Sequence, residues 1–127
     1  MSLNRVGVYG TLKKGHSNHH FMATARFVGR CRLKQITLYD IGPFPGAKLR
    51  PSQGIDVEIY DVTNELFARL DQLEGHNPRA PRAGEYDRRQ LETPFGLAWI
   101  YLYNRDVSGL PAIQRGGWRM PTASCRF

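Results

Sequence analysis

The chain has 127 residues, of which 41% are hydrophobic, and it carries two cysteines and a net charge of +7. The hydrophobic content excludes a disordered chain, and no apolar run reaches the ~20 residues that a membrane-spanning helix requires. Because this length is typical of one domain with its own core, we expect a single domain over residues 1–127.

The positive charge is concentrated in the first half of the chain. Residues 1–60 contain nine lysines and arginines against three acidic residues, whereas residues 61–127 contain nine against eight. Such a field attracts nucleic acid, steers a small carboxylate substrate or keeps the surface soluble, and the composition leaves these alternatives open. Nucleic acid is the least favoured partner, because no basic helix, RNA-binding aromatic motif or Cys/His finger accompanies the charge.

The N-terminal segment and the cysteines indicate the compartment. The first residues lead into a strand pattern without the apolar core of a signal peptide, and Cys31 and Cys125 are too few for a disulfide framework. We therefore expect a cytoplasmic protein in which both thiols are free.

Short strand patterns dominate the first sixty residues. The first strand is expected over residues 5–9, followed by a short helix over residues 19–25 and a second strand over residues 33–41. Residues 42–46 are expected to be irregular, because two prolines remove ladder donors and two glycines permit turn dihedrals. Residues 55–60 alternate cleanly, which predicts a strand whose two isoleucines and one valine face the core.

The second half contains the one clear helix pattern. Thr63 is a good N-cap for a helix that runs to about Glu74, and Gly75 directly after it is a natural terminator. Strands are expected over residues 86–91 and 95–103, and the second is apolar enough to be buried on both faces. Many short strands with one helix predict an α+β fold, specifically a small mixed β-barrel with flanking short helices.

Glu74 lies in line with the apolar stripe of the predicted helix. Leu66, Leu70 and Glu74 are spaced by four residues, so the carboxylate is turned inward. Burial and the negative end of the helix dipole both disfavour its charge and raise its pKa, which suits a general base. The alternative is that the helix frays at its last turn and Glu74 contacts water or a surface arginine, and the periodicity does not decide between the two.

A turn of small and apolar residues follows the first strand. It comprises Tyr9, Gly10, Thr11 and Leu12. Its backbone N–H groups suit an anion, although a glycine at this position also serves simply to relieve steric conflict.

Three histidines come shortly after this turn, at His16, His19 and His20. Their clustering raises the question of a metal site. No cysteine or carboxylate lies beside them at a familiar ligand spacing, so we expect no metal and no other cofactor.

Together these residues resemble the γ-glutamylcyclotransferase-like superfamily, in particular its short branch of γ-glutamylamine cyclotransferase and AIG2-like proteins. Residues 9–19 are similar to the opening signature of that branch, Tyr-Gly-Thr-Leu-Lys/Arg-x-Gly-x-x-Asn-His. Residues 70–75 are similar to its Leu-Asp-x-Leu-Glu-Gly segment, and residues 86–88 to the Tyr-x-Arg that follows. Weaker similarities come in the family's order at residues 57–60, 99–103 and 116–119.

The resemblance implies a small β-barrel and an enzyme that acts on a small-molecule γ-glutamyl substrate. In the implied reaction, the α-amine of the γ-glutamyl group attacks its own γ-carbonyl and releases 5-oxoproline together with an amine or amino acid. Glu74 is then the acid/base, and the turn from Tyr9 to Leu12 holds the glutamyl group. Tyr86 and Tyr103 are expected to place hydroxyls in the pocket, although buried tyrosines more often serve packing alone.

Two other functions fit parts of the same pattern. A non-catalytic module that binds a ligand or a partner protein on the same fold shares every motif, and turnover alone separates it from an enzyme. A basic adaptor for nucleic acid is the third alternative, and a steep salt dependence of its nucleic-acid affinity would identify it.

The chain departs from the family pattern between Glu74 and Tyr86. Residues 79–84 are additional there and carry two arginines. If this segment covers the mouth of the pocket, its charge disfavours cationic leaving groups such as polyamines. We therefore expect neutral or anionic γ-glutamyl derivatives to be the better substrates.

Overall fold

The computed structural model describes residues 3–16, 18–77, 79–80 and 82–118, and Cys125 lies outside them. Within these ranges the chain forms eight strands, one α-helix and one short 3-10 helix. In chain order they are β1 (Leu3–Val8), η1 (His19–Met22), β2 (Arg26–Leu33), β3 (Thr37–Asp40), β4 (Pro45–Lys48), β5 (Ile55–Thr63), α1 (Asn64–Leu73), β6 (Tyr86–Thr93), β7 (Gly96–Tyr103) and β8 (Ala112–Ile113).

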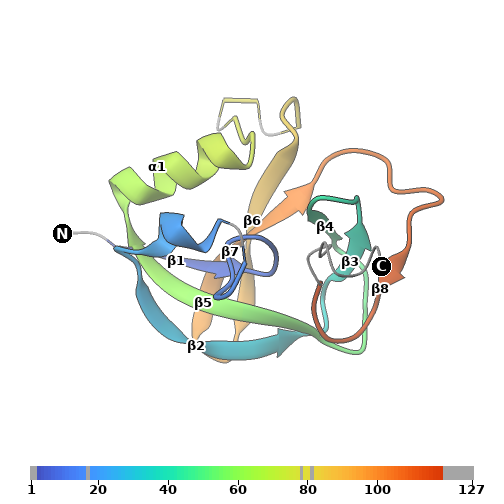
Figure 1. The fold of residues 1–127 in the computed structure, drawn as a ribbon, viewed down its shortest axis with the longest axis horizontal. Helices are drawn as coiled ribbons and strands as arrows, with labels where there is room; N and C mark the ends of the chain where they lie inside the picture. The colour runs from blue at the N-terminus through green and yellow to red at the C-terminus, as the bar shows by residue number, and fades with distance from the viewer. Residues whose placement is uncertain (1–2, 17, 78, 81, 119–127) are drawn as a thin grey trace, which may run out of the picture.

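The strands form two sheets, with α1 lying across the larger one (Figure 1). The larger sheet has the order β2-β5-β1-β7-β6, and the smaller has the order β4-β3-β8. β1 is antiparallel to β5 and parallel to β7. The expected α+β class is confirmed, but the described strands do not close into a barrel, so that part of the expectation is not confirmed.

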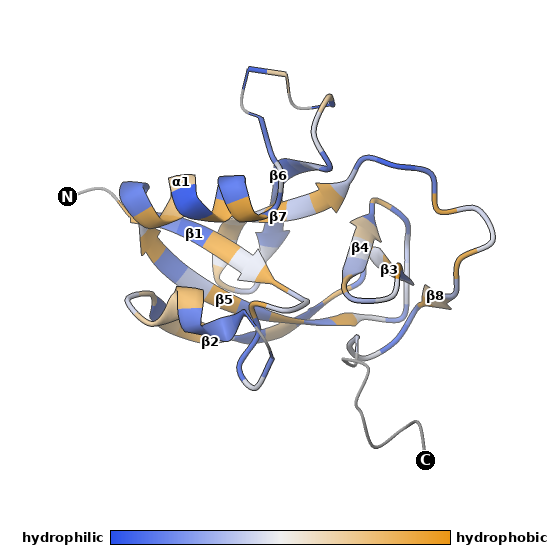
Figure 2. Ribbon diagram, turned by 45° about the horizontal axis from the view of Figure 1, so that its top comes forward, coloured by the Kyte–Doolittle hydropathy of each residue, from blue (hydrophilic) through white to orange (hydrophobic). Residues whose placement is uncertain are grey.

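The central strands of the larger sheet pack against hydrophobic residues on both faces. Alternate residues of β5 and β7, among them Ile55, Val57, Ile59 and Ile100, pack in a cluster on one face. The other face packs against α1, and the hydrophobic positions of this helix lie on its side that faces the strands (Figure 2). The expected core orientation of residues 55–60 is confirmed. The expected two-sided burial of residues 95–103 holds only toward the end of β7, because Leu97 is 50% exposed and Trp99 is partly exposed.

The helix begins and ends as the sequence predicts. Thr63 is the N-cap, and its Oγ1 accepts a hydrogen bond from the Leu66 N–H at 3.2 Å. Gly75 follows the helix with φ of 65°, a left-handed conformation that glycine adopts without strain. None of the helices in the described ranges is long and apolar enough to cross a membrane.

Two expectations for the segment between residues 26 and 48 are only partly confirmed. The predicted strand over residues 33–41 is in fact the end of β2 and, after a bend, the shorter β3. β2 was missed because its alternation is interrupted at a β-bulge between Phe27 and Gly29, and because several of its arginines are exposed at the sheet edge. Of the residues 42–46 that were expected to be irregular, 42–44 are irregular, but Pro45 and Gly46 begin β4. Pro45 is the first residue of an edge strand, where a missing N–H is tolerated.

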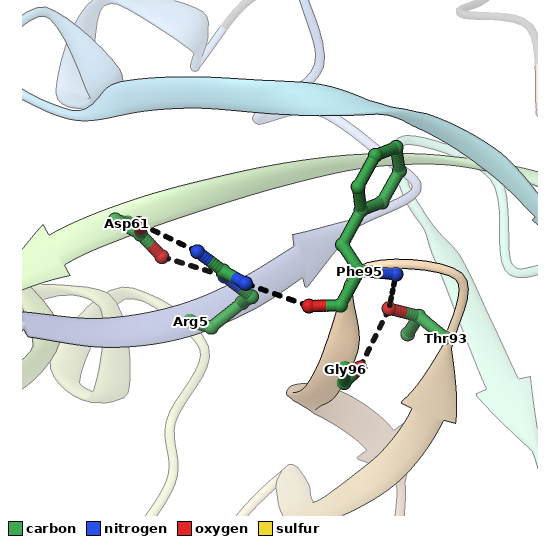
Figure 3. Close-up of polar contacts among 5 residues, drawn as sticks. All are labelled: Arg5, Asp61, Thr93, Phe95 and Gly96. Atoms are coloured by element: carbon green, nitrogen blue, oxygen red, sulfur yellow. Dashed lines mark hydrogen bonds and ion pairs between the residues drawn. The ribbon is translucent and has the colours of Figure 1, made fainter.

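A polar cluster joins three parts of the larger sheet (Figure 3). Arg5 of β1 donates two hydrogen bonds to Asp61 of β5, at 2.8 and 2.9 Å, and a third to the carbonyl of Phe95 at 2.6 Å. Thr93 closes the turn that carries Phe95, since its Oγ1 accepts from the Phe95 N–H at 3.0 Å and donates to the Gly96 carbonyl at 2.6 Å. These contacts fix β1, and with it the start of the turn that follows.

Candidate active site

A pocket opens where β1 ends, beside the C-terminal end of α1 and the start of β4. The pocket is small and partly open, and its space between atoms is about 340 Å³ when the adjoining open solvent is included. Its lining residues are Gly7, Val8, Tyr9, Gly10, Thr11, Leu12, Phe44, Pro45, Glu74, Tyr86 and Tyr101. The pocket therefore brings together the four turn residues, Glu74 and Tyr86, which the sequence analysis names as candidates.

Side chains from the following segment hold the turn in shape. Asn18 contacts it twice, through its backbone N–H on the Thr11 carbonyl at 2.8 Å and through its side-chain amide on Thr11 Oγ1 at 2.9 Å. His19 Nδ1 lies 3.0 Å from the Leu12 carbonyl. The Asn-His pair of the signature thus braces the turn, and neither residue lines the pocket.

Glu74 is the C-cap of α1, and its side chain lies in the pocket. Its backbone N–H donates to the Leu70 carbonyl at 2.9 Å, so the last helical turn is formed rather than frayed. Burial raises the pKa of Glu74 to about 7, and the negative charge of Glu85 adds to the shift. Within the described residues no side chain donates a hydrogen bond or forms an ion pair to its carboxylate. Glu74 therefore carries an unpaired carboxyl group that is about half ionised near neutral pH.

Three tyrosines line the pocket, and each hydroxyl donates its proton to a fixed acceptor. Tyr9 donates to the carbonyl of Tyr101, Tyr86 to the carbonyl of Pro45, and Tyr101 to Asp71 Oδ1, each at 2.7 Å. Burial raises the pKa of all three hydroxyls well above the ordinary value, so they stay protonated. Because their protons are engaged, their oxygens can only accept hydrogen bonds from a bound molecule.

Tyr103 lies behind the pocket and does not line it. Its ring packs against Tyr86 with 5.2 Å between centroids. Tyr101, which is not among the candidates predicted from the sequence, lies on the same face of β7 as Tyr103, and the alternation along this strand is the signal that could have found it. Phe44 and Pro45 also line the pocket, and they lie in the segment that the sequence pattern marks only as irregular.

The additional segment between α1 and β6 contributes none of its described residues (79, 80 and 82–84) to the pocket lining. Arg82 instead lies with Arg88 and Arg89 along a separate, shallow groove beside β6. No direct contact therefore supports an effect of this segment on the charge of a leaving group, which stays a prediction.

The histidines of the first loop have separate surroundings. His16 lies beside Trp118, with 5.8 Å between ring centroids, and His20 beside Phe21, with 4.4 Å. Over residues 3–16, 18–77, 79–80 and 82–118, no three histidines, cysteines or carboxylates gather as a metal site.

The pocket combines an unpaired carboxyl group of near-neutral pKa with a backbone turn, on an α+β fold. Such a site is suited to moving protons on a bound small molecule. Residues 6–120 match the family model described as gamma-glutamyl cyclotransferase, AIG2-like. The chain belongs to this family.

Known proteins agree with this assignment. The chain is 38% identical over 115 residues to the gamma-glutamylcyclotransferase family protein YtfP of Escherichia coli K12, covering 90% of this chain and 95% of that protein. It is 34% identical over 104 residues to the gamma-L-glutamyl-butirosin B gamma-glutamyl cyclotransferase of Niallia circulans, covering 78% of this chain and 66% of that protein. These relatives support a cyclotransferase-type enzyme.

Solved structures show the same fold. The solution structure of Escherichia coli ytfP matches with a TM-score of 0.70 at 38% identity, over 90% of this chain and 95% of that chain. The crystal structure of a mouse AIG2-like protein matches with a TM-score of 0.74 over 94% of this chain and 90% of that chain. Its identity is 24%, so this second likeness concerns the fold alone.

Proposed function

We propose that this protein is a cofactor-independent γ-glutamyl cyclotransferase, which converts a γ-glutamyl derivative into 5-oxoproline and a free amine or amino acid. The observation that carries the proposal is Glu74, an unpaired carboxyl group with a pKa of about 7 that shares one pocket with the turn after β1. The names of the family and of its relatives provide independent support.

The reaction needs a base because an α-ammonium group is not a nucleophile. The ionised Glu74 takes one ammonium proton, and the freed amine attacks the γ-carbonyl carbon to form a five-membered ring. Of the three ammonium hydrogens, one stays on the lactam nitrogen and two reach the leaving nitrogen as its bond to carbon breaks, so Glu74 carries them one at a time. A group with a pKa near 7 both accepts and returns protons efficiently at neutral pH.

The rest of the pocket orients the substrate. Backbone groups of the turn from Tyr9 to Leu12 hold the glutamyl moiety and stabilise the oxyanion of the tetrahedral intermediate. Tyr86 contacts the substrate directly, whereas Tyr103 supports the Tyr86 ring from behind. Holding the amine and the carbonyl in ring-closing geometry supplies several kcal/mol of the barrier.

The test is mass-spectrometric detection of 5-oxoproline from a panel of γ-glutamyl amines, γ-glutamyl dipeptides and glutathione. Glu74→Gln is expected to abolish turnover while binding persists, because the amide has the same shape but cannot accept the proton. Glu92→Gln, which changes an exposed residue at the far end of β6, is the matched control. Undiminished turnover by Glu74→Gln would remove Glu74 from the mechanism, and tight substrate binding without any turnover would identify a non-catalytic module.

The same panel tests the leaving group. Neutral and anionic γ-glutamyl derivatives are expected to have a higher kcat/KM than a γ-glutamyl polyamine, and deletion of residues 79–84 is expected to narrow the difference. A polyamine conjugate as the best substrate, with its rank unchanged by the deletion, would refute the electrostatic reasoning.

A further inference from the structure

Asp71 is a buried acid on the last turns of α1, and it is held from several sides. Its Oδ1 accepts a hydrogen bond from Arg88 Nε at 2.9 Å, and its Oδ2 accepts another from Arg88 Nη2 at 3.2 Å. The Arg88 guanidinium in turn packs against two neighbouring rings, 4.1 Å from the Phe67 centroid and 4.5 Å from the Trp99 centroid. The position of the Asp71 carboxylate is therefore fixed by a partner that cannot easily move.

The third hydrogen bond to this carboxylate comes from the pocket. Tyr101, which is 2% exposed, donates its hydroxyl proton to Asp71 Oδ1 at 2.7 Å. Asp71 and Glu74 are three residues apart at the end of α1 and so lie on one side of the helix. Glu74 and Tyr101 line the same pocket, and the charge of Glu74 adds to the raised pKa of the Tyr101 hydroxyl. This hydroxyl therefore lies near two carboxyl groups and gives its only proton to Asp71.

The other two hydroxyls of the pocket are engaged by backbone carbonyls, those of Tyr101 and Pro45. Of the three tyrosine hydroxyls, only that of Tyr101 donates to a side chain, Asp71, among the residues that the structure describes. A substitution of Asp71 can therefore remove this acceptor.

We propose that Asp71 is a positioning residue of this site: by taking the Tyr101 proton, it keeps Glu74 free of a hydrogen-bond donor and leaves the Tyr101 oxygen as an acceptor for the α-ammonium group of the substrate. The part that concerns the substrate rests on the proposed function, whereas the part that concerns Glu74 does not.

The physical reason lies in what a donor does to a carboxylate. A hydrogen bond to ionised Glu74 would stabilise the charged form, lower the pKa of Glu74 and weaken it as a base. Asp71 prevents this as long as it is the stronger acceptor. In Asp71→Asn, a neutral amide replaces the carboxylate, and ionised Glu74 then competes successfully for the Tyr101 proton.

The test is a double-mutant cycle read out by NMR, without substrate. The pKa of Glu74 is measured from ¹³C-labelled glutamate side chains, with the Glu74 signal assigned by Glu74→Gln. Asp71→Asn is expected to lower the pKa of Glu74 by about one unit, a typical effect of a hydrogen bond to a buried carboxylate. In the Tyr101→Phe background the same substitution is expected to have little effect, because no hydroxyl proton remains to be redirected.

Asp71→Asn also changes the local charge and packing, and it does so whether or not the Tyr101 hydroxyl is present. The difference between its effects in the wild-type and Tyr101→Phe proteins therefore reports only the redirected hydroxyl proton. Equal shifts with and without the hydroxyl, or no shift in either, would overturn the proposal. If Asp71→Asn does not fold, the pair Asp71→Asn and Arg88→Met removes both buried charges at once, a change that proteins often tolerate, and the cycle is repeated on that protein.

Turnover supplies a second readout. Tyr101→Phe is expected to raise KM more than it lowers kcat, because the variant loses an acceptor for the ammonium group but keeps the base. An unchanged KM would refute the acceptor role. If no 5-oxoproline is formed by any protein, the proposed function fails, and the NMR cycle still decides the role of Asp71.

Discussion

Glu85 lies close enough to Glu74 for its negative charge to raise the Glu74 pKa, and among the causes only the burial of Glu74 itself is larger. The backbone holds Glu85 in this place. Its N–H donates to the Gly75 carbonyl at 3.0 Å, and its carbonyl accepts from the Asn104 N–H at 2.9 Å. Two acids on either side of the segment between α1 and β6 are therefore held near one another, and of the two Glu74 lines the pocket.

Removing this neighbour is expected to shift the pH dependence of turnover. In Glu85→Gln the acid limb of kcat/KM moves to lower pH by less than about one unit, because burial remains the dominant cause of the raised pKa. The measurement is a pH profile of kcat/KM for wild type, Glu85→Gln and the exposed control Glu92→Gln. A profile of Glu85→Gln that superimposes on wild type would contradict the coupling.

Glu74 is expected to cost the protein stability at neutral and alkaline pH. Burial raises its pKa from the ordinary value of 4.5 to about 7 in the folded protein. A carboxyl group with a raised folded pKa is protonated in both states below about pH 4.5. Above that pH the unfolded state ionises first, so the penalty on folding grows up to about pH 7 and is constant beyond it. The penalty amounts to on the order of 3 kcal/mol at pH 8, since each pKa unit corresponds to about 1.4 kcal/mol.

Glu74→Gln is therefore expected to be more stable than wild type at pH 8 and about equally stable at pH 4.5. Urea denaturation at several pH values measures the difference, which should grow between pH 4.5 and 7 and then level off. Equal stabilities at pH 8 would show that the Glu74 carboxyl is better solvated than its surroundings indicate.

Gly10 is required because Pro45 lies against it. A Cβ at Gly10 would lie 2.9 Å from both Cδ and Cγ of the Pro45 ring, and Gly10 does not have the positive φ that other glycines of the chain show. Gly10→Ala is expected to destabilise the fold by about 1–3 kcal/mol and to raise KM, because the ring must move. Adding Pro45→Ala should restore both values, and failure of this rescue would point to another cause.

Metal removal is expected to leave turnover unchanged. The described part of the chain offers no group of three metal-ligating side chains, and the proposed proton transfers use Glu74 alone. Activity after dialysis against EDTA, with and without added divalent ions, tests this. A loss that a divalent ion reverses would contradict the prediction.

The helix and the buried strands could be predicted because their signals are local. Thr63 and Gly75 mark the two ends of α1 through their capping chemistry. β5 is recognised by its alternating hydrophobic and polar residues. β2 and β4 could not be predicted in the same way. A bulge breaks the pattern of β2, and Pro45 is allowed in a strand only because β4 lies at an edge, which is a property of the sheet rather than of the segment.

The residues of the candidate site show the same difference: some have a local signal in the sequence and others do not. Glu74 and the turn after β1 carry local signals of periodicity and small-residue content. Asp71 and Tyr101 do not, because their relationship depends on α1 packing against β7 and is a contact between residues thirty positions apart. The raised pKa of Glu74 was predicted from burial, whereas the contribution of Glu85 required the folded chain.

The smaller sheet has a consequence for how the pocket responds to a ligand. Two hydrogen bonds cross from β4 to the pocket tyrosines: the Ala47 N–H donates to the Tyr9 hydroxyl at 3.2 Å, and the Pro45 carbonyl accepts from the Tyr86 hydroxyl at 2.7 Å. Each sheet therefore contributes one wall of the pocket. The width of the pocket is set by how tightly the two sheets associate. A molecule that fills the pocket contacts both sheets and so stabilises their association. By thermodynamic linkage, a change that weakens the packing of the two sheets also weakens the binding of that molecule.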